Sequence, residues 1–356
     1  MELQDQNILL FARTMQLGGT ENVVLQLCEI FKPLVNKIIV CSSGGVNETK
    51  LKEMGIKHYA IGDPENKSPY NVIRNCYIIK KIVKNENITV IHTHHRMAAF
   101  YVRLLRLYKK CYFINTSHNT FTNHRLLTRF AYKKANLIAC GEMVKKNLVD
   151  YFGLEEVTVI HNAVKSFDGN LIIDPELKKE KDQGGFLVGN IGRLSRQKGM
   201  EFFIESVPGV IEKHPEVHFY IIGSGEDEEK LKKLSEDLPI TFMGYRTDIQ
   251  SLMSQFDLIV LSSLWEGLPL TPIEAFSVGK TIVATGVDGT LEIVENKKNG
   301  LIVEPKNGKQ ITDAINWLID NKSEIKKLET EAEETFHRRF SFEKLRENYI
   351  EFYLNL

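Results

Sequence analysis

Short apolar runs alternate with helical patterns along almost the whole chain, and this alternation restricts the fold more than any other feature. In the first half, apolar runs occur at 7–11, 37–41, 89–92, 112–115, 137–139 and 157–160. Helical periodicity lies between them at 21–31, 71–84, 97–108 and 125–134. This order predicts parallel strands with helices on both faces of a sheet.

The alternation stops over residues 166–185 and then restarts. That segment is polar and poorly periodic and ends in Lys-Glu-Lys-Asp-Gln-Gly-Gly, which is typical of a linker. Apolar runs resume at 186–191, 217–222, 240–243, 258–261, 281–284 and 300–303. The length of 356 residues also favours two domains. We therefore predict two doubly wound α/β domains, over 1–165 and 186–335, and an amphipathic C-terminal helix within 336–356 that needs a surface to pack on.

The cysteines and the apolar segments indicate the cellular compartment. Five cysteines lie in the first half, and none of them forms a Cys-x-x-Cys pair, so a reducing compartment fits better than a disulfide framework or a zinc site. The N-terminus lacks the pattern of a signal peptide, and no apolar run reaches 18 residues. We expect a cytoplasmic protein.

Charge is distributed unevenly although the formal net charge is zero. Residues 1–165 hold 23 Lys and Arg against 13 Asp and Glu, and the remainder holds 23 against 33, so the two parts carry +10 and −10. Residues 96–146 hold 11 basic residues and one acidic residue. A solvated helix face, an anionic membrane surface and nucleic acid could each explain this block. We favour peripheral contact with the inner face of the cell membrane, because too few acidic residues are present to pair the basic ones; no nucleic-acid motif accompanies the charge.

The segment 265–276, Trp-Glu-Gly-Leu-Pro-Leu-Thr-Pro-Ile-Glu-Ala-Phe, connects a predicted strand to a helix. Thr271 as N-cap, Pro272 at the first helical position and Glu274 three residues after the cap form a predicted capping box. Exposed amides at the helix start and the carboxylates of Glu266 and Glu274 suit a phosphorylated ligand that carries sugar hydroxyls. A purely structural role for Glu274, as a capping residue, stays open on spacing alone.

Three other turns follow predicted strands. Leu17-Gly-Gly-Thr-Glu21 lets backbone approach a ligand at a helix N-terminus, although such turns are also common as plain structure. Arg193 and Lys198 of Gly192-Arg-Leu-Ser-Arg-Gln-Lys-Gly199 can clamp a pyrophosphate or can be ordinary surface charges. Gly223-Ser-Gly225 lacks the third glycine of a dinucleotide fingerprint and is followed by acidic residues, which indicates an ordinary turn.

Histidines gather at the ends of two predicted strands. His92, His94 and His95 follow one strand, and His118 follows the next. Together they favour acid–base or substrate-orienting chemistry over isolated packing roles. No carboxylate or cysteine lies at metal-ligand spacing around them, and the chain contains no Asp-x-Asp.

The ordered set of these motifs resembles the retaining GT-B glycosyltransferases of glycosyltransferase family 4 over nearly the whole chain. The motifs are the Gly-Gly-x-Glu turn, the strand-end histidine, Val159-Ile-His-Asn-Ala-Val164, Gly192-Arg…Lys198-Gly199, Gly223-x-Gly225, Phe242-Met-Gly-Tyr245 and the 266–274 turn. The resemblance implies two tandem Rossmann-like domains with a cleft between them and a C-terminal helix that returns to the first domain. One departure is His161-Asn-Ala, which stands where the family commonly has Pro-Asn-Gly.

The resemblance also implies roles for matching residues. Glu266 would bind donor-sugar hydroxyls, Glu274 would bind the ribose, and Arg193 and Lys198 would neutralise the diphosphate. His94 would be the catalytic-region histidine. The remaining substrate-binding positions implied by the resemblance are Gly18, Gly19, Glu21, His118, Asn119, Tyr245, Arg246, Gly267, Leu270 and Thr271.

The implied activity is transfer of a hexosyl or N-acetylhexosaminyl group, with retention of configuration, from a nucleotide-diphosphate sugar. We expect a UDP-sugar donor, no metal or other cofactor, and a glycan or lipid-linked acceptor in cell-surface polysaccharide or glycolipid assembly. The main alternative is a non-catalytic GT-B partner subunit that binds a glycan or another transferase. A nucleotide-sugar epimerase or a phosphorylase on a similar scaffold is a further alternative, and a nicotinamide dehydrogenase ranks lower still.

Overall fold

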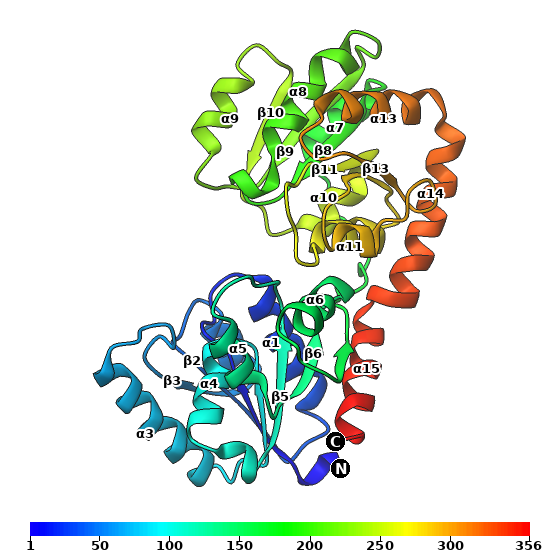
Figure 1. The fold of residues 1–356 in the computed structure, drawn as a ribbon. Coiled ribbons are helices and arrows are strands. Elements are labelled where there is room, and N and C mark those ends of the chain that lie inside the picture. Colours follow the sequence, from blue (N-terminus) through cyan, green and yellow to red (C-terminus); the bar gives the residue numbers. More distant parts are fainter. The chain divides into compact units, whose positions relative to one another are not determined.

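The computed structural model describes all residues 1–356 and contains two α/β units, each built around one parallel sheet (Figure 1). Residues Met1–Asn162 and Leu345–Leu356 form unit 1, and Ala163–Lys344 form unit 2. The prediction of two Rossmann-like doubly wound domains is confirmed.

Unit 1 has a seven-stranded sheet in the order β3-β2-β1-β4-β5-β6-β7, with all neighbours parallel. Its strands are β1 (Asn7–Phe11), β2 (Lys37–Ser42), β3 (Lys57–Ala60), β4 (Val90–Thr93), β5 (Tyr112–Ser117), β6 (Asn136–Ala139) and β7 (Val157–Val159). Six of them coincide with predicted apolar runs. β3 was not predicted; it is an edge strand with the sequence Lys-His-Tyr-Ala and no fully buried residue.

Helices connect these strands and cover the sheet (Figure 1). They are α1 (Gly19–Phe31), α2 (Glu48–Glu53), α3 (Pro69–Asn85), α4 (Arg96–Leu104), α5 (Arg125–Tyr132) and α6 (Glu142–Lys146), with short 3-10 or π segments η1 (Leu3–Asp5), η2 (Leu107–Lys109) and η3 (Asn147–Tyr151). β1 is buried along its whole length between β2 and β4, which explains its unbroken run of apolar residues.

Unit 2 has a six-stranded parallel sheet in the order β10-β9-β8-β11-β12-β13. Its strands are β8 (Phe186–Ile191), β9 (Val217–Ile222), β10 (Ile240–Gly244), β11 (Leu258–Leu261), β12 (Ile282–Thr285) and β13 (Leu301–Val303). Each matches a predicted run. The order reverses between β8 and β11, and loops after the strands on either side of such a switch point commonly form a ligand site.

The helical elements of unit 2 are α7 (Pro175–Asp182), η4 (Arg196–Lys198), α8 (Met200–Ile211), α9 (Glu228–Leu234), α10 (Ile249–Gln255), α11 (Leu270–Ser277), α12 (Thr290–Ile293), α13 (Gly308–Asp320), α14 (Lys322–Thr335) and η5 (Phe336–Phe340). A core cluster joins α8 and α13 to the sheet. In it, the ring of Phe203 on α8 lies 5.7 Å from that of Phe219 on β9. Burial of these faces explains the helical periodicity of the sequence.

The segment expected to be a linker, 166–185, contains helix α7. Asp174 caps this helix by accepting hydrogen bonds from the amides of Glu176 and Leu177, and Pro175 occupies its first turn. Because Asp followed by Pro is a common way to begin a helix, the signal was present within a highly charged stretch.

Helix α15 (Phe342–Leu354) carries the chain back to unit 1. Leu345, Tyr349 and Tyr353, spaced four residues apart, are buried. The Tyr353 ring lies 4.3 Å from that of Phe31 on α1. The expected surface for the amphipathic C-terminal helix is therefore the unit 1 core.

Candidate active site

Two histidines at the carboxyl end of the unit 1 sheet contact each other. His94 follows β4 and His118 follows β5, and these two strands are parallel neighbours. Nδ1 of His94 lies 3.2 Å from Nε2 of His118, and the rings stack with centroids 5.5 Å apart. The two histidines are therefore neighbours, as expected for residues that follow adjacent parallel strands.

Both imidazoles are neutral because burial disfavours their charged forms. Burial lowers the pKa of His94 well below its usual value and the pKa of His118 to about 4. Nε2 of His94 and Nδ1 of His118 are buried and have no hydrogen-bond partner within the protein. Since a neutral imidazole has one donor and one acceptor, the pair offers one free donor and one free acceptor, whichever ring donates to the other.

His92 lies beneath this pair and is fixed by helix α15. Its Nδ1 is 2.8 Å from the Tyr353 hydroxyl, its Nε2 is 2.7 Å from Oγ1 of Thr116, and its ring stacks on His94 with centroids 4.3 Å apart. Burial lowers the pKa of His92 to about 3. With both nitrogens bonded, the His92 ring cannot rotate without losing buried hydrogen bonds, so it forms a rigid support for His94.

A cavity of about 290 Å3 opens beside the histidines. Four predicted residues line it, namely Glu21, His94, His118 and Asn119. His95, which belongs to the predicted group of strand-end histidines, also lines it. No role in the site was predicted for the other lining residues, Arg13, Thr14, Thr20, Arg96, Thr116, Ser117, Phe121 and Tyr132. Gly18 caps α1 and Gly19 begins it, and the space where a Gly19 side chain would lie is open.

Arg13 and His95 share acidic partners at the cavity edge. Arg13 forms a bidentate pair with Asp63 and a second ion pair, 2.7 Å, with Glu65. Nδ1 of His95 accepts from the Met97 amide, and its Nε2 lies 3.4 Å from Glu65. The one available signal for Arg13 was its position two residues after the first strand.

Lys198 and Glu266 form a buried ion pair in unit 2. Nζ of Lys198 lies 2.6 Å from Oε1 of Glu266, and the side chains are 16% and 7% exposed. Ser263 Oγ donates to the same oxygen at 2.7 Å, and Gln197 Nε2 donates to Oε2 at 3.3 Å. Such a pair persists because every part of the carboxylate is hydrogen-bonded. Ser263 and Gln197 were not predicted.

A glycine keeps the backbone at Lys198 against β11. Gly199 has a φ of +54°, and a Cβ atom there would lie 2.4 Å from the Ser262 carbonyl oxygen. Ser262 Oγ also donates to the Lys198 carbonyl at 3.0 Å. The Lys-Gly order therefore lets the turn before α8 lie close enough to the end of β11 for Lys198 to meet Glu266.

No hydrogen bond or ion pair within the protein involves the carboxyl group of Glu274, and the residue is only partly exposed to solvent. Desolvation raises the pKa of Glu274 to about 7, and the nearby charge of Lys198 partly opposes this shift. A partly buried carboxyl group without a partner is unfavourable, because the lost hydration is not replaced. It indicates a place where a ligand supplies the missing hydrogen bonds.

Helix α11 does not begin with the predicted capping box. It begins at Leu270, with Pro269 as the N-cap residue and no side-chain cap. Thr271 lies inside the helix, where its hydroxyl donates to the Ile191 carbonyl at 3.5 Å. The capping-box prediction for Thr271 and Glu274 is wrong, because the helix starts two residues earlier than the Thr-Pro pair suggests. Glu274 thereby loses its structural explanation.

The turn before α11 packs against the loop after β12. A Cβ atom on Gly289 would lie 1.8 Å from the Gly267 carbonyl oxygen. The Glu266 amide donates to Oδ2 of Asp288 at 3.3 Å. This contact fixes the backbone that carries Glu266 and Gly267.

Arg193 lies apart from the Lys198–Glu266 pair. Its side chain is 74% exposed, and its Nε lies 3.3 Å from Glu226. The acidic turn after Gly225, which argues against a dinucleotide site, therefore supplies the partner of Arg193.

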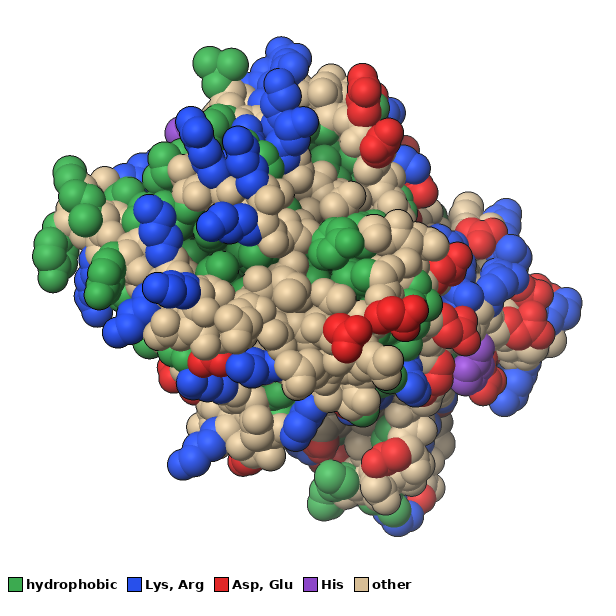
Figure 2. Space-filling model, turned by 90° about the horizontal axis from the view of Figure 1, so that it is seen from below, with side chains coloured by type: hydrophobic (Ala, Val, Ile, Leu, Met, Phe, Trp, Pro, Cys, Tyr) green, Lys and Arg blue, Asp and Glu red, His purple; other side chains and the backbone are tan.

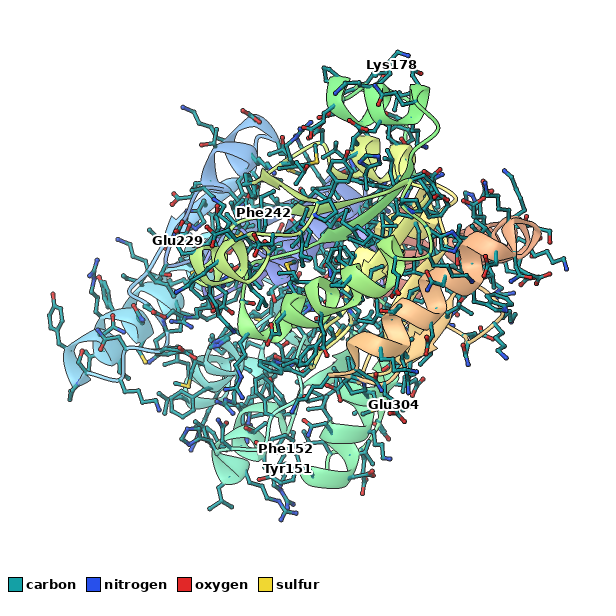
Figure 3. The ribbon with its side chains drawn as sticks, turned by 90° about the horizontal axis from the view of Figure 1, so that it is seen from above. Tyr151, Phe152, Lys178, Glu229, Phe242 and Glu304 are labelled. Atoms are coloured by element: carbon teal, nitrogen blue, oxygen red, sulfur yellow. The ribbon has the colours of Figure 1, made fainter.

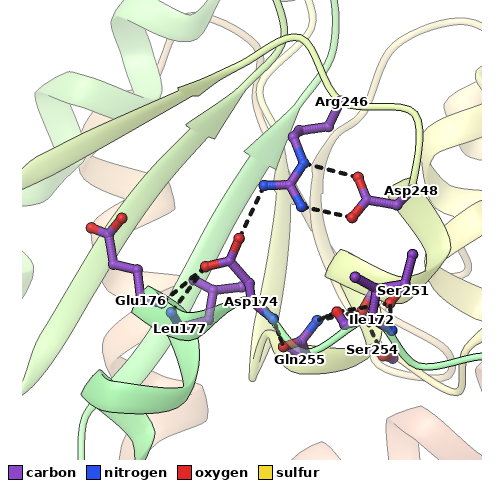
Figure 4. A network of polar contacts seen from close by, with 9 residues as sticks. All are labelled: Ile172, Asp174, Glu176, Leu177, Arg246, Asp248, Ser251, Ser254 and Gln255. Carbon is purple, nitrogen blue, oxygen red and sulfur yellow. Dashed lines mark hydrogen bonds and ion pairs between the residues drawn. The ribbon is translucent and has the colours of Figure 1, made fainter.

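Tyr245 is exposed, and Arg246 belongs to a network of carboxylates (Figure 4). The guanidinium binds Asp248 through two nitrogens and Asp174 through the third, at 3.0 Å. It thus ties the N-cap of α7 to the β10–α10 turn. The substrate-binding role that the resemblance implies for Tyr245 and Arg246 remains a prediction.

Two further findings concern metals and membranes. No group of three or more His, Cys, Asp or Glu side chains is arranged to hold a metal ion. None of the helices combines the length and the apolar character needed to span a bilayer.

Comparison with known proteins identifies the family. The model of glycosyl transferases group 1 matches residues 174–335, and the model of Glycosyltransferase Family 4 matches residues 17–166. Together the two matches cover both units.

Curated relatives carry related names at low identity. An Escherichia coli UDP-Gal:alpha-D-GlcNAc-diphosphoundecaprenol alpha-1,3-galactosyltransferase is 26% identical over 86% of each chain. A Staphylococcus aureus poly(ribitol-phosphate) alpha-N-acetylglucosaminyltransferase is 28% identical over 62% of this chain and 44% of its own. The match to an uncharacterised glycosyltransferase of Methanocaldococcus jannaschii, 26% identical, spans 65% of each chain.

Solved structures share the fold over the full length. A glycosyltransferase from Rickettsia africae has a TM-score of 0.86 at 22% identity, covering 98% of both chains. The Anabaena protein HepE, solved in complex with UDP, has a TM-score of 0.83 at 22% identity over 99% of this chain and 100% of its own. With two parallel sheets, two family models and these relatives in agreement, the chain belongs to the GT-B glycosyltransferases of the family 4 type.

Proposed function

We propose that this protein transfers a sugar from a nucleotide-diphosphate donor, a UDP-sugar, to a glycan or lipid-linked acceptor, with retention of anomeric configuration. The pathway class is assembly of cell-surface polysaccharide or glycolipid. The partly buried carboxyl group of Glu274, which has no partner within the protein and lies near the Lys198–Glu266 pair, carries this proposal.

The chemistry of unit 2 fits a nucleotide sugar. A ribose carries two neighbouring hydroxyls, and a carboxylate such as Glu274 can accept a hydrogen bond from each. Lys198 can stabilise the negative charge that develops on the leaving diphosphate. Glu266, held by Lys198, Ser263 and Gln197, has fixed acceptor oxygens for sugar hydroxyls.

The chemistry of unit 1 fits a substrate hydroxyl. The free donor and the free acceptor of the His94–His118 pair complement a hydroxyl group, which can both donate and accept. Glu21, whose Oε1 accepts from Thr14, contributes a second acceptor to the same cavity. His94 orients the reacting sugar in this proposal.

The names of relatives support the donor and acceptor classes. The Anabaena neighbour binds UDP, and the Escherichia coli relative is named for a UDP-sugar donor and a diphosphoundecaprenol-linked acceptor. Metal-free catalysis is also proposed, since Lys198 and the amides at the start of α11 can supply positive potential at the diphosphate.

UDP binding tests the proposal. We expect UDP to raise the melting temperature in the presence of a chelator, and Glu274→Ala to abolish the shift. Glu334→Ala, which removes an exposed glutamate on α14, is the matched control and should keep it. If no nucleoside diphosphate shifts the wild-type protein, the transferase proposal fails. A donor-hydrolysis screen followed by NMR of the anomeric proton of the product then tests sugar identity and retention.

We also propose peripheral contact of unit 1 with anionic lipid through the basic segment 96–146. Arg103 lies over the rings of Tyr108 and Phe130, and Arg125 lies over Tyr151, which is labelled in Figure 3. These contacts hold cations beside the exposed side chains of Leu126 and Phe130. Binding through them should be salt-sensitive, because it rests on charge.

A further inference from the structure

Helix α3 buries Ile79 and Ile82 but also carries three large hydrophobic side chains on its solvent-facing side. Tyr70, Ile73 and Tyr77 are 77%, 70% and 68% exposed. They are spaced three and four residues apart, so they form one stripe on the outer face. In Figure 2, hydrophobic side chains protrude at the left edge, where Figure 1 places α3.

The inner face of the same helix is partly polar. Asn71 is buried and donates to the carbonyls of Asp63 and Asn66 at 2.9 and 2.8 Å. Asn75 is buried and bonds both the amide and the carbonyl of Gly62 at 2.9 Å. Folding of unit 1 therefore does not require Tyr70, Ile73 and Tyr77 to be apolar, and their stripe calls for something outside the unit to cover it.

The charges around the stripe identify what fits over it. Residues 66–85 contain five basic residues and no acidic residue. The basic residues are Lys67, Arg74, Lys80, Lys81 and Lys84, all exposed. The nearby carboxylates are already engaged, Asp63 and Glu65 with Arg13, and Glu86 with Lys37 and Lys57. The partner of this face must be anionic and able to take up apolar side chains.

A second copy of the chain does not meet this description. A symmetric contact through α3 would place five cations against five cations, and like charges repel. A bilayer with anionic lipids meets both conditions, since phosphates meet the basic side chains while two tyrosines and an isoleucine enter the interface.

We propose that α3 lies in the surface of an anionic membrane, with Tyr70, Ile73 and Tyr77 inserted below the headgroups and the basic side chains at the phosphates. α3 lies outside the basic segment 96–146, so this proposal adds an insertion face to the charge-based contact proposed above. It rests on the proposed function only for its purpose, which is access to a lipid-linked acceptor.

Vesicle sedimentation with the full-length protein tests the insertion face. The wild type should bind vesicles of phosphatidylcholine mixed with phosphatidylglycerol, and should bind those of phosphatidylcholine alone weakly. Combining Tyr70→Ser, Ile73→Ser and Tyr77→Ser should reduce binding at near-physiological salt by about tenfold or more, because the apolar contribution is lost. Wild-type binding by this variant would overturn the proposal.

The chain offers a matched control elsewhere. Leu171, Ile172 and Ile173 of unit 2 are also about half exposed. Replacing these three by serine removes as many apolar side chains from a surface outside α3, and should leave vesicle binding within about twofold of wild type. An equal loss in both triple variants would overturn the assignment to α3.

A fluorescence measurement reports insertion at one position. Both native tryptophans, Trp265 and Trp317, lie in unit 2. Ile73→Trp adds one on α3, and brominated lipid should quench its emission and shift it to the blue, with much less effect on the wild type. Absence of added quenching in vesicle-bound Ile73→Trp protein would overturn the proposal. So would a wild-type dimer that the triple serine variant abolishes, because α3 would then be a self-association face.

The UDP-induced melting shift on the same preparations separates the two proposals. A normal shift in the triple α3 variant that no longer binds vesicles supports the membrane face and shows that the protein is folded. Loss of the UDP shift in the wild type, with vesicle binding retained, would remove the transferase proposal alone.

Discussion

The two units place opposite kinds of chemistry at equivalent edges of similar sheets. In unit 1 the carboxyl ends of β4 and β5 carry imidazoles that burial keeps neutral. In unit 2 the turns after β8 and β11 carry a buried ion pair, Lys198–Glu266, and a carboxyl group without a partner, Glu274. The doubly wound scaffold accommodates both, because the sheet fixes only where the turns lie and the side chains decide their polarity.

The difference shows how each edge avoids the cost of buried charge. In unit 1 the buried imidazoles are neutral, and the ring of His92 stacks on that of His94. Unit 2 pairs a cation with a hydrogen-bonded carboxylate. A neutral site suits orientation of hydroxyls, whereas a charged site suits a diphosphate, so the comparison agrees with the proposed division of substrates.

Removal of the cation should have the largest effect. Lys198→Ala leaves the buried Glu266 carboxylate without its counter-charge, and breaking a buried pair costs about 3–5 kcal/mol. Differential scanning calorimetry should show a lower melting temperature for unit 2 and little change for unit 1. Lys309→Ala, at an exposed i,i+4 pair, is the control. A Lys198→Ala protein as stable as this control would show that the pair contributes little.

The second-largest effect should be an opposite dependence of folding stability on pH in the two units. The folded-state pKa of Glu274 is raised to about 7, so the folded form binds its proton more tightly and loses stability as pH rises from 4.5 to 7, on the order of 3 kcal/mol. The folded-state pKa values of His92 and His118 are lowered to about 3 and 4, so their contribution is present above pH 6.5 and is lost as pH falls. Melting curves between pH 4 and 8, about the working range for these groups, check both slopes.

Single substitutions assign those slopes to residues. Glu274→Gln should reduce the loss of folding stability that accompanies a rise in pH. His92→Gln should reduce the loss of folding stability that accompanies a fall in pH. If the slope of unit 2 is unchanged in Glu274→Gln, the carboxyl group is ionised at low pH, and the contrast between the units fails in this respect.

Loss of one hydroxyl group in α15 should have an intermediate effect. Tyr353→Phe leaves Nδ1 of the buried His92 without a partner, which costs about 1–3 kcal/mol. Tyr349→Phe removes a longer bond, 3.3 Å to Thr116, and should cost less. Chemical denaturation gives the two values, and 15N NMR of the histidine rings should show a changed His92 signal in Tyr353→Phe. An unchanged signal would contradict the support role of α15.

The smallest effect should come from the exposed pair of Arg193 and Glu226. Glu226→Gln should change stability by less than about 0.5 kcal/mol, because both side chains are largely in solvent. It should strengthen UDP binding by a few-fold if Arg193 then turns to the diphosphate. Titration calorimetry measures this change, and weaker binding in Glu226→Gln would exclude competition between the carboxylate and the ligand.

Local patterns were sufficient for most of the fold. Twelve of the thirteen strands coincide with apolar runs, since parallel strands are buried on both faces. β3 was not predicted, because its sequence Lys-His-Tyr-Ala has neither an apolar run nor a clear alternation of apolar and polar residues. Helix α7 was not predicted, because its highly charged sequence was interpreted as a linker despite the helix-start signal of Asp174 and Pro175.

The candidate site was less accessible to sequence reasoning. Strand-end position identified His94 and His118, and a Gly-Pro turn pointed to Glu266 and Glu274. The helix start was misplaced because Thr-Pro is a strong local signal, although Pro269 already ends the turn. The contact between His92 and Tyr353 could not be predicted from residues near His92, because it forms only in the completed fold.

That contact has a consequence for the order in which the protein is made. His92 and Tyr353 are separated by 261 residues in the sequence. At a translation rate of roughly 5–20 residues per second, Tyr353 is synthesised on the order of 10–50 s after His92, and the His92 imidazole lacks this hydrogen-bond partner until then. During that interval unit 2 is synthesised, while the unit 1 side chains that α15 covers in the folded protein, such as Phe31, lack that cover. A chaperone would therefore meet unit 1 with these apolar side chains uncovered, and the histidine cluster can reach its final form only after unit 2 has been synthesised.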